Sequence, residues 1–354
     1  MRGVTDGPRR QLQPSRRALG VLLGVLLGAL IAGCATPAQS PVTSPSGDPN
    51  GIVAEVATYQ LVANQPGRLL VALLAADNRW LSFGDVEVSF GFLGAAAGSP
   101  SGLGGTPSAG AVLADATAHF LPIPGSPDGV DRPPTLALPA DGRGVYAVEP
   151  ITFPTAGYWQ VVARGELGDG RTFTAEAAFT VLDAPSVIGV GERAPLTDNP
   201  VIGDPGVSAT AIDSRAAGGQ QIPDPELHST SIADAIRAGH PALVVFSTPV
   251  YCVSRFCGPV TDLVAELAAK YGDRADFIHI EIYQDFEAGK VNQAALDWLM
   301  PANGDLREPW TFLIGADGRI AGSWDTVVTR GELEPLLQAL PVKSARESPA
   351  GAVP

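Results

Sequence analysis

The chain has 354 residues, 45% of them hydrophobic, and its 37 acidic side chains against 23 lysines and arginines give a formal net charge of −14. This length is ample for two domains with cores of their own. An acidic surface is repelled by phosphate backbones and by anionic lipids, so the charge argues against nucleic-acid binding and against electrostatic attachment to a membrane.

The N-terminal segment has the pattern of a secretory signal. Five arginines precede an apolar run over residues 18–32, and small residues follow at the expected cleavage position. The run is shorter than the roughly 20 residues that a membrane-spanning helix needs. The letters "IAGC" resemble the lipobox of bacterial lipoproteins, which implies a signal peptide over 1–33 and a lipidated Cys34. The alternative is an ordinary signal peptide with a chance cysteine.

Residues 34–51 are rich in Pro, Ser and Gly and predict a flexible tether. Removal of residues 1–33 takes away five arginines and one aspartate and leaves a net charge of −18. We therefore expect an extracytoplasmic protein that is held at the cell membrane by its lipid anchor alone.

Residues 52–183 predict an antiparallel β-sandwich. Short stretches rich in Val, Phe, Tyr and Thr are separated by Gly, Pro and Asp turn signals. The stretch "FPTAGYWQVVARG" (153–165) resembles the late strand of bacterial immunoglobulin-like domains. The low-complexity segment 95–110 predicts a mobile loop. His119 stands alone in this region, without a cluster of His, Cys or carboxylate side chains that would mark a site, so we expect a spacer or binding module. The clearest strands are expected at 67–77, 85–94, 144–153, 157–167 and 172–183.

Residues 184–227 lack a clear period and predict a linker and entry segment, whereas 228–342 alternate between helical and strand patterns. Such alternation predicts an α/β layer structure with a mixed sheet. Ser231 or Thr230 is expected to cap the first helix and Thr329 the last. The expected elements are a helix at 230–239, a strand at 241–247 buried on both faces, a helix at 258–272, a strand at 276–285, a helix at 290–300, a strand–turn–strand at 310–324, a helix at 329–341 and a disordered tail at 343–354.

That element order, with two cysteines where the first buried strand meets its helix, is similar to the thioredoxin fold over about residues 188–341. "VGERAP" (190–195) resembles the entry segment of the peroxiredoxin and membrane-anchored thiol–disulfide reductase branches. "EPWTFLIGADGRI" (308–320) resembles their P-x-T-F-L-I-D-x-D-G-x-I stretch. The resemblance implies a cis peptide bond at Pro309 beside the active disulfide, and a partner groove shaped by Pro309 and Trp310.

The stretch "FSTPVYCVSRFCGPVTD" holds Cys252 and Cys257. With Cys34 lipidated, these two thiols remain free to pair, and outside the cytoplasm we expect them to oxidise. In regular helix their Cα atoms would be roughly 8.6 Å apart, beyond the limit of about 7 Å for a disulfide. Either Cys252 therefore lies in the loop before the helix, or pairing requires local unwinding.

The resemblance implies that Cys252 is the nucleophile and Cys257 the resolving thiol. A helix N-terminus favours a thiolate, and we expect Cys252 to gain this. Glu281 and Asp262 are candidates for a nearby proton acceptor. The expected function is thiol–disulfide exchange with exported thiol or disulfide proteins, an oxidoreductase activity without a cofactor or metal.

Four alternatives remain open at this point. The first alternative is a binding or scaffold lipoprotein whose disulfide is a structural clip. The second is a thiol peroxidase, because one-helix, two-cysteine peroxiredoxins share the Cys-x4-Cys spacing, although Pro249 stands where they have Thr or Ser. A third alternative is a copper chaperone, since membrane-tethered copper chaperones share this fold and soft thiolates suit Cu(I). The cysteine spacing is one residue too long for that family, His279 lies in a strand pattern typical of a packing histidine, and His228 and His240 lack a spacing rule. Finally, "FCGPV" resembles the thioredoxin "WCGPC", which would make Cys257 the nucleophile.

Overall fold

A computed structural model describes residues 51–95, 112–129, 131–300 and 306–343 of the chain. The expected signal peptide and Cys34, and the expected tether apart from Gly51, lie outside the described residues, as do nearly all of the 95–110 loop and the tail. Within the described ranges, no helix has the length and apolarity that crossing a membrane requires.

The region 52–183 forms one antiparallel sheet, ordered β6-β3-β2-β7-β5-β4-β8-β9, with β1 paired to β2. The prediction of antiparallel strands is confirmed, and the five expected strands match β2, β4, β7, β8 and β9 to within two residues at each end. The strands are β1 (Ile52–Val56), β2 (Pro66–Ala75), β3 (Trp80–Ser82), β4 (Asp85–Gly94), β5 (Val112–Pro122), β6 (Thr135–Ala137), β7 (Gly144–Thr152), β8 (Gly157–Glu166) and β9 (Thr172–Val181).

Hydrogen bonds link these strands into a single sheet, where two separate sheets of a sandwich were expected. An isolated bridge between Val62 and Leu182 joins the segment after β1 to the residue that follows β9. This contact shows that the sheet curls on itself. Alternate residues of β8 face one core, and Trp159 is fully buried there. Its indole Nε1–H donates to the Thr155 carbonyl at 2.9 Å, so the buried ring keeps no unpaired donor.

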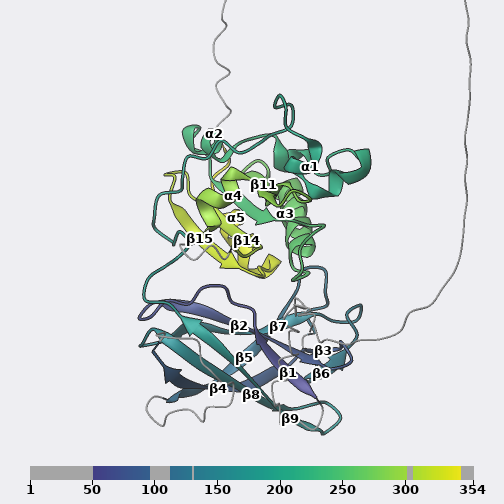
Figure 1. Cartoon of the computed structure of the whole chain (residues 1–354), viewed down its shortest axis with the longest axis vertical. Coiled ribbons are helices and arrows are strands. Elements are labelled where there is room, and N and C mark those ends of the chain that lie inside the picture. Colours follow the sequence, from purple (N-terminus) through teal and green to yellow (C-terminus); the bar gives the residue numbers. More distant parts are fainter. Residues whose placement is uncertain (1–50, 96–111, 130, 301–305, 344–354) are drawn as a thin grey trace, which may run out of the picture. The chain divides into compact units, whose positions relative to one another are not determined.

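The second region contains a four-stranded sheet ordered β11-β10-β14-β15 (Figure 1). The pair β10–β11 is parallel and the other two pairs are antiparallel, so the prediction of a mixed sheet is confirmed. The strands are β10 (Ala242–Ser247), β11 (Asp276–Glu281), β12 (Tyr283–Asp285), β13 (Lys290–Val291), β14 (Trp310–Ile314) and β15 (Ile320–Asp325), of which β12 and β13 form a separate pair. The helices are α1 (Ala209–Ile212), α2 (Ile232–Arg237), α3 (Cys257–Tyr271), α4 (Gln293–Leu299) and α5 (Arg330–Ala339), with 3₁₀ turns η1 (Ser214–Gly219) and η2 (Pro225–His228).

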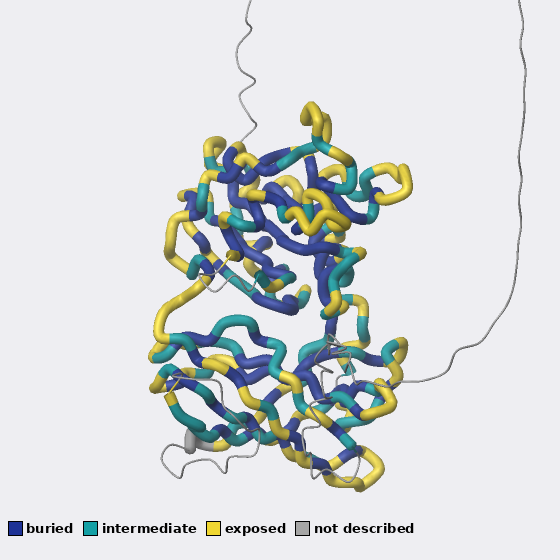
Figure 2. Tube along the Cα trace, in the orientation of Figure 1, coloured by how far each residue is buried: buried dark blue, intermediate teal, exposed yellow. Residues whose placement is uncertain are grey.

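Helices cover both faces of this sheet. Val244 and Phe246 of β10 pack with buried residues of α2 and α4, whereas Leu243 and Val245 pack with those of α3 and α5. All six residues of β10 are buried, as the unbroken apolar run predicts. In this region the buried segments lie inside and the exposed ones mostly in the outer loops (Figure 2). The carboxyl end of β10 therefore leads the chain directly from the core to the cysteine loop.

Two of the expected helix caps are present. The Ser231 hydroxyl accepts a hydrogen bond from the Asp234 backbone N–H, and Thr329 forms a reciprocal capping box with Glu332. These local bonds fix where α2 and α5 begin, and hence how they lie on the sheet.

Candidate active site

Cys252 and Cys257 form a disulfide with their Cα atoms 6.1 Å apart. Cys252 lies in the loop after β10, and α3 begins at Cys257, so pairing needs no unwinding of regular helix. The helix thus begins five residues after Cys252, so Cys252 is not part of it. Arg255 has a φ of 65°, which no right-handed helix accommodates, while Pro259 suits a first turn because it lacks an N–H.

The two sulfur-bearing residues differ in exposure. Cys257 is 0% exposed, whereas Cys252 is partly exposed and its neighbour Val253 is 95% exposed. The Ser254 hydroxyl lies 3.1 Å from the Cys252 sulfur. Cys252 is therefore the member of the pair that a partner molecule can approach.

Cys257 is held in place by polar contacts at the base of the loop. The Thr261 hydroxyl donates to the Cys257 carbonyl at 2.9 Å and lies 2.6 Å from the Ser247 hydroxyl at the end of β10. Phe256, at the N-cap position of α3, supplies no side-chain hydrogen bond to the helix. The disulfide thus lies at the positive end of the α3 dipole, because Cys257 is the first residue of the helix. No capping side chain bonds the free N–H groups of this first turn.

Glu308 is a member of the site that the sequence did not single out. One of its carboxylate oxygens and both cysteine sulfurs all lie within 4.8 Å of one another. Burial, and to a smaller extent the charge of Glu281, raises the pKa of Glu308 to about 8. Its Oε2 is buried without a hydrogen-bond partner among the described residues. The protonated form of Glu308 therefore predominates at neutral pH beside the disulfide, and the carboxylate is the minor form.

One signal in the sequence could have indicated Glu308. It directly precedes Pro309, the residue that the resemblance sets beside the disulfide, and the Glu308–Pro309 peptide bond is cis. Trp310, expected to shape a partner groove, is 5% exposed and stacks on Phe312 with ring centroids 5.6 Å apart.

The two carboxylates proposed as proton acceptors have other partners. The Glu281 carboxylate accepts hydrogen bonds from the backbone N–H groups of Ser214 (2.8 Å) and Tyr283 (3.3 Å). Asp262 forms an ion pair with Arg215 at 3.3 Å, and its side chain is 65% exposed. Glu281 thus affects the disulfide site through its negative charge on Glu308.

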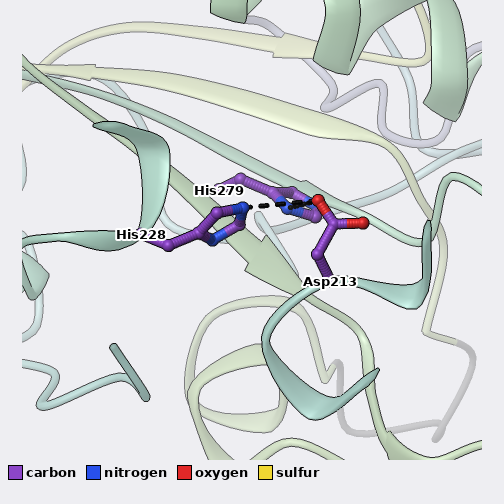
Figure 3. A group of neighbouring side chains, drawn as sticks. All are labelled: Asp213, His228 and His279. Atoms are coloured by element: carbon purple, nitrogen blue, oxygen red, sulfur yellow. Dashed lines mark ion pairs between the residues drawn. The ribbon is translucent and has the colours of Figure 1, made fainter. Parts of the chain in front are cut away.

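A second group of polar side chains lies on β11 and the preceding segment. Asp213, His228 and His279 point toward one another, and each side chain is 0% exposed (Figure 3). Burial by itself raises the pKa of Asp213, but its polar contacts with His228, His279 and Arg215 outweigh this and hold the pKa well below its usual range. Burial also lowers the pKa of His228. The group therefore combines an ionised carboxylate with a neutral imidazole.

The sequence does not indicate this group. No spacing links His228 to His279, and Asp213 falls in the segment predicted as a linker. The other two histidines lie elsewhere, His240 beside Asp276 at 3.1 Å and His119 exposed beside Asp85.

The fold and site define an α/β region with a partly exposed disulfide beside a buried, protonated carboxyl group. Comparison of the chain with models of protein families, with curated proteins and with solved structures gave no match. The case for a function therefore rests on the chemistry of the site.

Proposed function

We propose that this is an exported, lipid-anchored protein whose C-terminal region is thioredoxin-like and exchanges disulfides with other exported proteins. The observation that carries the proposal is the Cys252–Cys257 disulfide, with one residue accessible and the other buried, next to the Glu308 carboxyl. On this proposal the region 52–183 is an immunoglobulin-like spacer or binding module.

The first step is an attack by Cys252. In the reduced protein the Cys252 thiolate attacks one sulfur of a partner disulfide, and the partner's S–S bond breaks as a mixed disulfide forms. The departing partner thiolate takes up a proton. The partial exposure of Cys252, the nearby Ser254 hydroxyl and the dipole of α3 support this role.

The second step returns the protein to its disulfide form. The Cys257 thiol transfers its proton to the carboxylate form of Glu308 and attacks the Cys252 sulfur, so the mixed disulfide breaks. The partner departs as a thiolate and takes the proton from Glu308, which restores the carboxylate. One disulfide is made in this chain and one is reduced in the partner, so electrons balance. A carboxyl with a pKa of about 8 suits this transfer, because the acid and base forms are both accessible near neutral pH. The reverse sequence oxidises a partner dithiol.

The reduction potential of the Cys252–Cys257 pair tests the proposal. We expect a value between roughly −270 and −120 mV, the span of known exchange proteins, and a lowered pKa of the Cys252 thiol in the reduced protein. Redox titration against glutathione or thioredoxin buffers, in a Cys34→Ser background, gives the potential. A value below about −300 mV would instead identify a structural clip in a scaffold protein.

Apolar side chains around Cys252 support a protein as the partner. Val250 and Val253 in the cysteine loop are 51% and 95% exposed, and Phe286, stacked on Tyr251, is 43% exposed. We expect Val253→Glu to slow exchange with a protein disulfide by about tenfold, because a charge replaces apolar contact area. Reduction by dithiothreitol should not change. Val342→Glu, at a comparably exposed position, is the matched control; equal losses in both variants would contradict a docking role for Val253.

A further inference from the structure

The buried group of Asp213, His228 and His279 is assembled from three separate segments. Asp213 lies between α1 and η1, His228 ends η2, and His279 lies in the middle of β11. Leu227, next to His228, packs in the same apolar cluster as Phe277 of β11, which places η2 on the α3 side of this strand. Three polar side chains, each 0% exposed, thus converge at a point that is closed to bulk solvent.

The spacing of the atoms fits a bound cation better than direct hydrogen bonds. Asp213 Oδ2 lies 3.3 Å from His228 Nε2 and 3.5 Å from His279 Nδ1, at or beyond the upper end of N–H···O distances. Around a four-coordinate zinc ion with bonds of about 2.1 Å, neighbouring ligand atoms are about 3.4 Å apart. One ligand atom from each residue lies within 4.8 Å of the others, as a shared ion requires (Figure 3).

The one hydrogen bond of the His279 ring and the unpartnered nitrogens of both imidazoles support the same conclusion. His279 Nε2–H donates to the Ser247 carbonyl at 3.1 Å, which in the neutral ring leaves Nδ1 as a lone pair facing the carboxylate. Within the described part of the chain, His279 Nδ1 and both ring nitrogens of His228 are buried without a hydrogen-bond partner. Two lone pairs that face each other repel unless a cation lies between them.

Arg215 completes the surroundings of the group. Its Nε and Nη2 contact the Asp213 carboxylate at 2.8–3.2 Å, and its backbone N–H donates to Asp213 Oδ1 at 2.8 Å. These bonds fix the orientation of the carboxylate, while the Ser247 carbonyl fixes that of the His279 ring. Such outer contacts orient the ligands in metal sites.

We infer that Asp213, His228 and His279 bind one divalent transition-metal ion through Oδ2, Nε2 and Nδ1, with a water molecule as the fourth ligand. Two imidazoles and a carboxylate suit Zn²⁺. The ion ties the segment that holds Asp213 and His228 to β11 at the edge of the sheet, so it stabilises the fold. This inference is independent of disulfide exchange.

The test uses the full-length chain in detergent, with Cys34→Ser and with the Cys252–Cys257 disulfide kept oxidised, so that no thiolate is available. We expect one equivalent of Zn²⁺ by elemental analysis after dialysis, and a higher melting temperature with Zn²⁺ than with a chelator. Co²⁺ should give the visible absorption of a four-coordinate site without a thiolate charge-transfer band. That spectrum needs no variant, so it decides the matter even where a substitution prevents folding.

Variants then assign the ligands. We expect His228→Gln and His279→Gln each to weaken Zn²⁺ binding at least about 100-fold. His240→Gln is the matched control, because His240 is also buried beside an aspartate but at 3.1 Å and without a second histidine in its ion pair. Failure to bind one equivalent, undiminished binding in both variants, or binding only after the disulfide is reduced would each overturn the inference.

Discussion

Cys257→Ser is expected to trap a mixed disulfide between this protein and its partner, while Cys252→Ser is expected to lower the exchange rate by about three orders of magnitude or more. The reason is the difference in exposure, since Cys252 is partly exposed and Cys257 is 0% exposed. Without Cys257 the first attack still occurs, but no buried thiol remains to release the partner. Non-reducing electrophoresis and intact-mass measurement, with both variants in a Cys34→Ser background, detect the adduct.

The reverse pattern would change the mechanism. An adduct that accumulates in Cys252→Ser but not in Cys257→Ser would make Cys257 the nucleophile, as the "FCGPV" alignment implies. Exchange that is negligible in the unsubstituted chain, with no adduct in either variant, would leave a disulfide that only stabilises the fold.

Most helices and strands of the C-terminal region could be predicted because their signals are local. The apolar run of 241–247 differs from the observed strand by one residue at its start, and the helical period of 258–272 differs from α3 by one residue at each end. Ser231 and Thr329 act as caps through bonds to residues three positions away. Such signals depend on neighbours in the chain, and the sequence displays them directly.

The path of the cysteine loop before α3 and the closure of the first sheet depend on information of another kind. The positive φ at Arg255 has no compositional signature, so the sequence left open whether Cys252 lies in the loop before the helix. Likewise, the five expected strands carry the alternation of a half-buried sheet. That alternation does not say whether the strands form two sheets or one curled sheet.

The candidate sites depend on contacts between distant residues. Asp213 and His279 are separated by more than sixty positions and meet because their segments pack at one sheet edge. The carboxyl of Glu308 has an unusual pKa because the fold buries it near Glu281. In the sequence, Asp213 and Glu308 do not differ from ordinary surface carboxylates, and His279 does not differ from an ordinary strand histidine.

Glu308→Gln is expected to slow the release of the partner from the mixed disulfide by about 10²–10⁴-fold at pH 7, because glutamine cannot take the proton of Cys257. It should leave the first attack by Cys252 nearly unchanged. Stopped-flow measurement of both steps with a protein disulfide separates them. Glu287→Gln, an exposed position in the β12–β13 turn, is the control. If Glu308→Gln slowed both steps equally, Glu308 would shape the site without transferring the proton.

The same substitution should change the pH dependence of stability. The pKa of Glu308 is about 8 in the folded chain, against an ordinary value of 4.5. The folded state therefore binds more protons than the unfolded state between these values, so this group lowers the free energy of unfolding as pH rises from 4.5 through 8. Glu308→Gln removes that loss. The free energy of unfolding of the oxidised variant minus that of the parent should therefore be about 2–3 kcal/mol larger at pH 8.5 than at pH 4, allowing for the partial exposure of Glu308. Urea unfolding at the two pH values measures the difference. If the stability difference between variant and parent were the same at both pH values, the folded carboxyl would ionise as it does in water. The proton transfer from Cys257 to Glu308 would then lose its physical basis.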